Sequence, residues 1–157
     1  GVGSFKQGIK NLKERGLVEL LNEEVIQKKK PFLGICLGMQ LIMDQGNEPT
    51  PCRGLGWIKG KVVAIENTYL PVPHLGWNNT YQLNEKNKED KLSNNFYFIH
   101  SFHTLPEDDE VICTYVDYEY PMVASIQKGN IFATQFHPEK SQEAGLSLLK
   151  NFIESYA

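Results

Sequence analysis

Apolar residues recur at helical spacing close to the N-terminus of this chain. Phe5, Ile9 and Leu12 lie three or four positions apart, which puts them on one face of a helix. Ser4 has a side chain that can cap the start of this helix, and Gly16 is placed to end or bend it. The pattern therefore predicts an amphipathic first helix that packs through one face.

A second helix, a strand and a third helix follow along the chain. An apolar stripe predicts a helix over about 17–30, which Pro31 stops because the residue before a proline avoids helical backbone angles. The apolar run 32–35 predicts a short strand, and the residues up to Met43 predict a helix. The stretch 46–60 is rich in glycine and proline and predicts a loop.

The second half of the chain has a β-rich pattern that a helix closes. Lys128-Gly129-Asn130 is a hairpin signal between two β-prone runs. The prolines of 71–78 indicate an extended segment without regular pairing, and the polar stretch 84–95 predicts turns. The predicted strands are 61–65, 96–100, 111–115, 122–127 and 131–136. A last helix is predicted from about Gln142, with Ser141 available as its cap.

The order of these elements favours a single α/β domain. Helices surround one central strand in the first half, strands dominate the second half, and a helix ends the chain. This order is typical of a mixed sheet covered by helices. The 157 residues suffice for one domain with a sizeable core, so we expect one domain over 1–157.

Composition and charge exclude several classes of function. A hydrophobic content of 41% and a charged content of 22% are ordinary for a globular protein. The net charge of -3 gives no basic footprint for nucleic acid, and no window approaches the apolar length of a membrane span. No signal peptide is visible. The 3 cysteines form no C-x-x-C pair, which argues against a disulfide scaffold and for a reducing, cytoplasmic compartment.

Cys36 lies at the predicted turn between the apolar strand and the third helix. Gly34 and Gly38 bracket it in the G-x-nucleophile-x-G pattern of a nucleophile elbow, with cysteine where many hydrolases carry serine. At such a turn the side chain stands at a helix N-terminus, where the thiol should lose its proton more easily. The alternative is a buried structural cysteine between a strand and a helix.

His137 and Glu139 follow directly after a predicted strand. Pro138 disfavours helix at His137, and residues two apart in an extended chain point the same way. The carboxylate could therefore hold the imidazole, as the acid does in a catalytic triad. The alternative is a surface loop with a chance histidine. The combination with the elbow favours the catalytic interpretation, because both elements belong at the edge of a sheet where active sites form.

A metal site is the competing interpretation for a second group of residues. His100 and His103 form an H-x-x-H pattern, and Cys52 and Cys113 could serve as further ligands. Strand geometry puts the two histidines on opposite faces, and no carboxylate motif joins them. We therefore expect no metal.

The two catalytic motifs together resemble a known family. Gly34 to Gln40 and Gln135 to Glu139 are similar to the class I (triad) glutamine amidotransferases. Further stretches narrow the resemblance to the HisH family, the glutaminase subunits of imidazole glycerol phosphate synthase in histidine biosynthesis. These stretches are 73–78, 98–102 and 135–141.

The resemblance implies a reaction and a role for each matching residue, and it implies no cofactor. Cys36 would attack the side-chain amide of glutamine, His137 would hand a proton to departing ammonia, and Glu139 would complete the triad. Water would then cleave the thioester and release glutamate. The matching oxyanion positions are Val2, within the turn 1–3, and Leu37. The matching glutamine-binding positions are Gly3, Gln40, Ser101 and Phe102. For Gln40 the alternative is a solvated helix residue.

The resemblance also implies a partner protein. Ammonia stays a nucleophile only while it is unprotonated, so family members pass it through a dry channel to a (β/α)8-barrel cyclase subunit. Positions at or near that interface match His74, Trp77, Asn78 and Tyr97. The alternative for Trp77 is a core tryptophan. Family members are poor glutaminases alone, and a rearrangement of the oxyanion turn is thought to couple glutamine cleavage to the partner's ligand.

The expected fold is a three-layer α/β domain with a mixed, mainly parallel central sheet. Family members begin well before Gly1, so the resemblance implies that a βαβ unit of about 30 residues or more is missing here. We therefore expect an N-terminally truncated domain with an exposed sheet edge.

Other functions remain open on the sequence alone. HisH-like paralogues supply ammonia for the modification of sugars in surface-polysaccharide pathways. From other classes, a cysteine hydrolase or peptidase could use the same elbow, and a non-catalytic regulatory subunit would fit a truncated chain.

Overall fold

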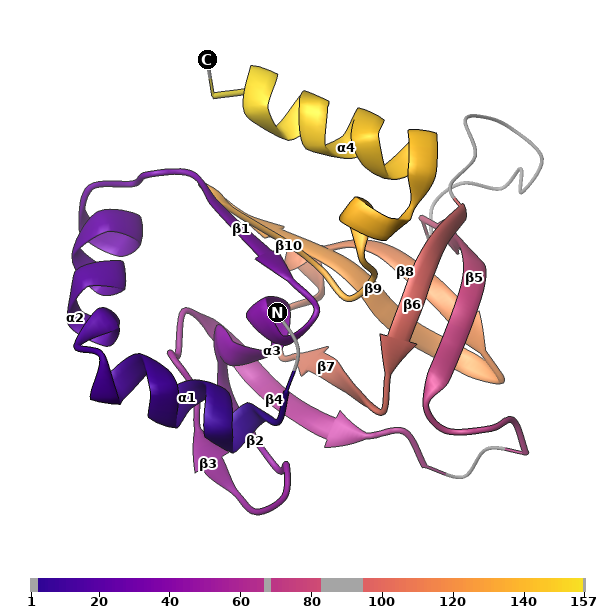
Figure 1. Cartoon of the computed structure of the whole chain (residues 1–157), viewed down its shortest axis with the longest axis horizontal. Helices are drawn as coiled ribbons and strands as arrows, with labels where there is room; N and C mark the ends of the chain where they lie inside the picture. Colours follow the sequence, from indigo (N-terminus) through magenta and orange to yellow (C-terminus); the bar gives the residue numbers. More distant parts are fainter. Residues whose placement is uncertain (1–2, 67–68, 83–94, 157) are drawn as a thin grey trace.

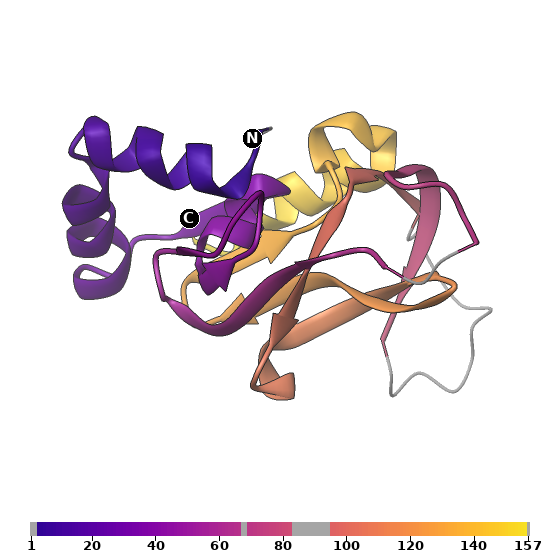
Figure 2. The same cartoon turned by 90° about the horizontal axis from the view of Figure 1, so that it is seen from below.

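Helices and two sheets make up the part of the chain that the computed structural model describes, residues 3–66, 69–82 and 95–156. α1 and α2 lie at one end of the molecule, and β5 and β6 lie at the other (Figure 1, Figure 2). The α-helices are α1 (Phe5–Glu14), α2 (Leu17–Leu21), α3 (Leu37–Leu41) and α4 (Gln142–Glu154). The other helical segments are the π-helix η1 (Asn22–Gln27) and the 3-10 helices η2 (Asp109–Val111) and η3 (Pro138–Lys140).

The strands form a six-stranded sheet and a four-stranded sheet. They are β1 (Phe32–Ile35), β2 (Met43–Gly46), β3 (Cys52–Arg53), β4 (Ile58–Ala64), β5 (His74–Tyr81), β6 (Asn95–His100), β7 (Phe102–Pro106), β8 (Ile112–Tyr118), β9 (Tyr120–Lys128) and β10 (Ile131–Thr134). The orders are β1-β10-β9-β8-β5-β6 and β3-β2-β4-β7. The architecture is mixed, as expected. Among the described strands, however, parallel pairing is confined to β1 with β10 and β2 with β4, so the sheet is not mainly parallel.

A sharp bend joins the two sheets. β6 ends at His100 in the first sheet and β7 begins at Phe102 in the second, with Ser101 between them. The Ser101 carbonyl accepts a hydrogen bond from the backbone N–H of Ile65, just after β4. The Phe102 carbonyl accepts one from the side chain of Gln40 on α3. The bend is therefore fixed against both the second sheet and α3.

The N-terminal helices follow the predicted pattern with one change. α1 starts after Ser4, whose hydroxyl oxygen accepts a backbone N–H of the first turn, and Gly16 ends it in the left-handed conformation. The second helix was expected over about 17–30. It is α-helical only to Leu21 and continues as a wider π-helix to Gln27.

The third helix is shorter than the sequence predicts. It was expected to reach Met43, but it ends at Leu41, and β2 begins at Met43. The carbonyl of Ile42 accepts the backbone N–H of Trp57, so a returning chain segment takes the hydrogen bond that would continue the helix. The prediction of a loop over 46–60 is wrong in part, because this stretch contains β3 and the start of β4.

β5 is a regularly paired strand, although the prolines indicated otherwise. From His74 it runs in antiparallel register with β6. Pro71 and Pro73 both precede the strand, so their missing N–H groups do not interrupt the ladder. The predicted turns over 84–95 lie outside the described residues, apart from Asn95 at the start of β6.

Aromatic packing supports the chain just ahead of His137. The ring of Phe136 stacks on Phe96 with centroids 4.0 Å apart and meets Phe98 edge-on at 5.7 Å. Such pairs contribute about 0.5–1.5 kcal/mol each beyond the area that they bury. The connection between β10 and η3 is thus anchored in a buried cluster.

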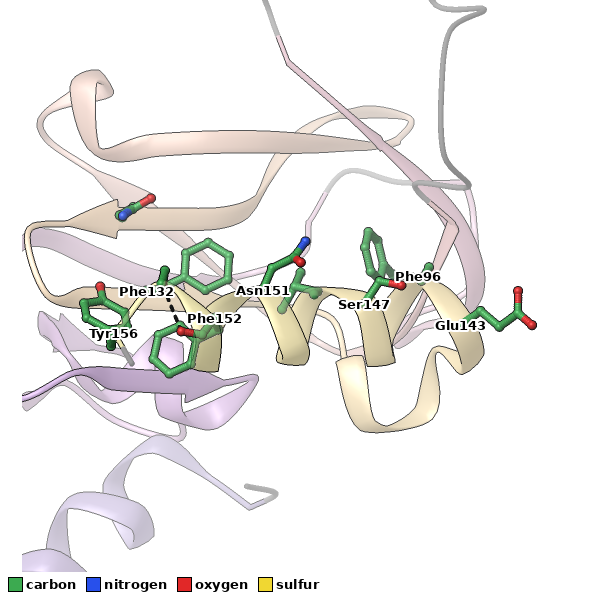
Figure 3. Close-up of a pocket in the computed structure, with 11 residues that line it drawn as sticks. Phe96, Phe132, Glu143, Ser147, Asn151, Phe152 and Tyr156 are labelled. Carbon is green, nitrogen blue, oxygen red and sulfur yellow. Dashed lines mark hydrogen bonds between the residues drawn. The ribbon is translucent and has the colours of Figure 1, made fainter.

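A cavity of about 630 Å³ lies between α4 and the sheet (Figure 3). Phe152 of α4 and Tyr156, just beyond the end of α4, line it, and Phe132 of β10 lies across from them. None of the described residues predicted for the active site lines this cavity.

Candidate active site

The turn at Cys36 has the strained geometry of a nucleophile elbow. Cys36 lies between β1 and α3 with φ 52° and ψ −104°, angles that non-glycine residues rarely adopt. A side chain at Gly34 would come within 3.0 Å of the backbone of Gly38, so the strand and helix need glycine here to pass so closely. Nothing lies within 4 Å of a side chain added at Gly38. Only the first of the two bracketing glycines is therefore required for close approach.

His137 and Glu139 form the predicted pair. Nδ1 of His137 lies 2.6 Å from Oε1 of Glu139 across the start of η3. The backbone N–H of His137 donates to the Tyr97 carbonyl at 2.9 Å, which ties this segment to β6. The sequence predicted that Ser141 caps α4. Its side chain makes no such capping hydrogen bond. Its hydroxyl instead donates to the His137 carbonyl at 2.6 Å and accepts the N–H of Tyr97 at 3.0 Å.

Cys36 and His137 follow neighbouring parallel strands, but no hydrogen bond joins them. Ile35 pairs with Thr134 at the ends of β1 and β10, so both residues emerge at the same sheet edge. The Cys36 thiol donates instead to the carbonyl of Ile99, at 3.8 Å. Nε2 of His137 is buried and has no hydrogen-bond partner. Among the described residues, Nε2 of His137 is thus paired neither with the Cys36 thiol nor with any other group.

The electrostatics of the site work against the thiolate in this state. Burial raises the pKa of the Cys36 thiol, although the N–H groups of Leu37 and Gln135 act in the opposite direction. The N–H of Leu37 at the helix N-terminus thus acts as expected, but burial outweighs it and the pKa of this thiol is raised overall. Burial also opposes ionisation of Glu139. The hydrogen bond from His137 and the backbone N–H of Glu139 outweigh it and lower the pKa of this carboxyl.

A pocket of about 260 Å³ opens over Cys36. It brings together the nucleophile and every described residue predicted for the oxyanion or for glutamine. The lining residues are Gly3, Cys36, Leu37, Gln40, Glu48, Pro73, Ile99, His100, Ser101 and Phe102. Val2 lies outside the described residues. Gln40 is buried, so it is not a solvated helix residue.

Two residues of the site have no role that the sequence predicts. Glu48 lines the pocket, and its carboxylate accepts the backbone N–H of Phe5 at 2.9 Å. It lies in a stretch that had only a loop signal, so no pattern marked it. Gln135 is fully buried, and its Nε2 donates to Cys36 Sγ at 3.6 Å. Its place two residues before His137 was the one available signal.

The residues predicted for the partner interface lie on β5 and β6 and differ in exposure. Trp77 is 46% exposed, so it is not a core residue, and nearby Leu75 is 59% exposed. The ring of Tyr97 on β6 lies 6.0 Å from Trp77 in an edge-on arrangement. His74, by contrast, is 3% exposed and points inward, and Asn78 donates its side-chain N–H to the Asp117 carbonyl.

His100 and His103 are both buried. No group of three or more histidine, cysteine, aspartate or glutamate side chains among the described residues is arranged to hold a metal ion.

The helices in the described part of the chain are all too short or too polar to span a membrane.

Comparisons with known proteins agree with this geometry. A family model described as glutamine amidotransferase class-I matches residues 1–155. A protein of Campylobacter jejuni named imidazole glycerol phosphate synthase subunit HisH 1 is 51% identical over 98% of this chain and 77% of its own length. The HisH subunits of Pelagibacter ubique and Aquifex aeolicus are 45% and 44% identical, over 98% and 97% of this chain and 76% and 73% of their own lengths.

Solved structures show the same fold at lower identity. A crystal structure of a glutamine amidotransferase covers 97% of this chain and 74% of its own, with a TM-score of 0.65 and 16% identity. One from Thermotoga maritima covers 99% and 62%, with a TM-score of 0.56 and 20% identity. The chain belongs to the class-I glutamine amidotransferases and, within them, to the family of HisH subunits of imidazole glycerol phosphate synthase.

Proposed function

We propose that this chain hydrolyses glutamine through a thioester on Cys36 and delivers the ammonia to a cyclase subunit in histidine biosynthesis. The observation that carries this proposal is the pocket over the strained Cys36, at the sheet edge where His137 is paired with Glu139. Free cysteines that form no disulfide suit the reducing cytoplasm as the place of action.

The chemistry assigns each proton. Glu139 accepts the Nδ1–H of His137, which leaves Nε2 as the base that takes the Cys36 thiol proton. The sulfur attacks the amide carbon of glutamine, and His137 returns the proton to the leaving nitrogen as the C–N bond breaks. Water then attacks the thioester and its proton passes to His137; as the C–S bond breaks to give glutamate, His137 returns this proton to the Cys36 sulfur. The N–H of Leu37 and one N–H of the turn 1–3 would hold the oxyanion.

Recognition of glutamine needs a partner for its α-ammonium group. Glu48 is the one carboxylate among the residues that line the pocket, so we assign it this role. Gln40 gives its side-chain N–H groups to Phe102 and Gln135, which leaves its carbonyl oxygen free to accept from the ligand. The walls at Ser101 and Phe102 offer backbone groups.

The chain alone is in a resting state. The Cys36 thiol points to the Ile99 carbonyl and its pKa is raised by burial, while Nε2 of His137 has no partner. Catalysis requires the sulfur to turn toward His137. Binding of the cyclase supplies the energy for this change, and glutamine cleavage therefore depends on the partner.

The partner would be a (β/α)8-barrel cyclase that forms a heterodimer with this chain. Its docking surface is the outward face of β5, where Leu75 and Trp77 are exposed beside Tyr97. Exposed aromatic and aliphatic side chains of this kind are typical of the centre of an interface.

The test uses the assembled complex with Cys36→Ala and, as a matched control, Cys52→Ala. Cys36→Ala should abolish synthesis from glutamine, leave synthesis from added ammonia intact and still co-elute with the cyclase. Cys52→Ala should behave as the unaltered protein. Loss of both glutamine- and ammonia-dependent synthesis in an assembled Cys36→Ala complex would refute the ammonia transfer, and ester or peptide cleavage without glutamate release would show a cysteine hydrolase instead.

A further inference from the structure

Gln135 contacts the sulfur of Cys36 from a position that no solvent reaches. Its side chain is 0% exposed, and its backbone N–H donates to the Ala124 carbonyl at 2.8 Å, which fixes the residue beside β9. Nε2 lies 3.6 Å from Cys36 Sγ, and Oε1 lies 3.1 Å from Nε2 of Gln40. A polar side chain this deeply buried needs partners for both ends of its amide, and these two residues provide them.

The direction of these hydrogen bonds is fixed by a backbone carbonyl. The carbonyl of Phe102 can only accept, so the side-chain nitrogen of Gln40, 3.1 Å away, must point at it. The second hydrogen of that nitrogen then demands an acceptor, and Oε1 of Gln135 occupies the position. The nitrogen of Gln135 is consequently left facing the sulfur, where it can act only as a donor.

A pair of neutral histidines holds the same carbonyl from the other side. Nδ1 of His100 donates to the Phe102 carbonyl at 2.9 Å, which leaves Nε2 of this ring as an acceptor. Nδ1 of His74 lies 3.0 Å from that nitrogen and must donate to it. The Phe102 carbonyl thus accepts two hydrogen bonds, one from His100 and one from Gln40. Both bonds hold it in place.

We infer that Gln135 is a further functional residue of the reaction centre, whose N–H stabilises the Cys36 thiolate, and that the Phe102 carbonyl sets its orientation through Gln40. This inference rests on the proposed role of Cys36 as the nucleophile. A donor to a charged sulfur gains more than a donor to a neutral thiol, so Gln135 favours ionisation when His137 takes the proton. The Gln40 side chain is then a positioning group as well as a wall of the pocket.

The test measures the pH dependence of Cys36 alkylation by iodoacetamide, followed by peptide mass spectrometry, in the complex with the cyclase. Gln135→Met keeps the length of the side chain but removes the donor. We expect the alkylation midpoint to rise by about one pH unit and kcat for glutamine to fall about tenfold or more, with KM little changed. Gln127→Met, an exposed position on β9, is the matched control and should leave both unchanged.

Gln40→Met tests the orienting step without altering Gln135. Once the Gln40 donor is lost, the Gln135 amide is free to turn, so the alkylation midpoint should again rise. The double variant should rise no further than Gln135→Met alone, because both substitutions remove the same hydrogen bond. Additive shifts, or an unchanged midpoint in Gln135→Met, would overturn the inference. If Gln135→Met fails to co-elute with the cyclase, an unchanged midpoint in Gln40→Met decides against it.

The Cys36→Ala complex separates this inference from the proposed function. Glutamine-dependent synthesis that survives Cys36→Ala would refute the nucleophile itself. Synthesis that is lost in Cys36→Ala but unaffected in Gln135→Met would refute the role of Gln135 alone.

Discussion

The imidazole of His137 is bound on one side only, with Nδ1 2.6 Å from the carboxylate of Glu139 and Nε2 buried without a partner. A carboxylate can only accept from Nδ1, so the neutral ring carries its proton there. The other nitrogen then has a lone pair directed away from Glu139. The ring is set in the tautomer that a general base needs before any substrate arrives.

Glu139→Gln reverses this tautomer. An amide nitrogen at position 139 would donate to Nδ1, which would place the ring proton on Nε2 and block the base. We expect kcat for glutamine to fall by at least about a hundredfold, as triads lose most of their rate when the acid becomes an amide. Steady-state glutamate release in the assembled complex measures this. A loss of less than threefold would show that Glu139 does not orient the ring.

His74 and His100 make the fold sensitive to acid. Burial lowers the pKa of His74 to about 4 and the pKa of His100 to about 3, against an ordinary value of 6.5. The folded state therefore favours the neutral rings. Their contribution to stability is complete above pH 6.5 and is lost as the pH falls from 6.5 toward 4 and 3.

His74→Phe should separate titration from packing. The new ring keeps the stacking that His74 makes with Phe98 and Tyr118 but cannot take a proton. It also leaves Nε2 of His100 without its donor, which costs about 1–3 kcal/mol at neutral pH. Urea unfolding between pH 7 and pH 4.5 should show a lower stability at pH 7 and a shallower decline toward acid than the unaltered chain. An equal decline would refute the assignment of the acid response to His74.

Gly145 lets α4 pack against the turn that carries Glu139. A side chain at Gly145 would lie 1.8 Å from the Pro138 carbonyl oxygen, so backbone would have to move. Gly145→Ala should lower the free energy of unfolding by about 1–3 kcal/mol or more. Gly38→Ala meets nothing within 4 Å and is the matched control, which should be neutral or slightly stabilising by thermal unfolding. Equal effects of the two would contradict this packing.

Trp77 is the proposed anchor of the cyclase interface. Trp77→Ala should weaken the complex by about 2 kcal/mol, or about thirtyfold in Kd, when association is measured by calorimetry. Leu146→Ala removes a side chain that is 64% exposed on α4 and that does not line the pocket beside Trp77, and it should leave Kd unchanged. If Leu146→Ala weakens binding and Trp77→Ala does not, the interface lies on α4.

Local signals in the sequence predicted much of this structure. The capping of α1 by Ser4, the hairpin around Gly129 and the strained turn at Cys36 each depend on a few neighbouring residues, and all three are confirmed. The early end of α3 at Leu41 could not be predicted in this way. It depends on a hydrogen bond between Trp57 and Ile42, and pairing across such a distance leaves no periodic signal.

The candidate site shows the same division. Cys36, His137 and Glu139 lie in motifs whose spacing reports their chemistry. Gln135 and Glu48 each have a hydrogen-bond partner that only the folded chain brings near. The partner of Gln135 is Cys36, and the partner of Glu48 is Phe5. The inward direction of His74 likewise follows from the register of β5 on β6. The prolines just before β5 indicated no regular pairing, so this register could not be predicted.

Covalent labelling tests whether Cys36 is the nucleophile that glutamine-dependent synthesis requires. The complex with the cyclase is treated with a glutamine-mimicking electrophile and digested, and the peptides that contain Cys36, Cys52 and Cys113 are weighed by mass spectrometry. We expect label on Cys36 alone, with a proportional loss of glutamine-dependent synthesis and with protection by glutamine. An unlabelled Cys36 in a complex that has nevertheless lost its glutamine-dependent synthesis would contradict this role of Cys36.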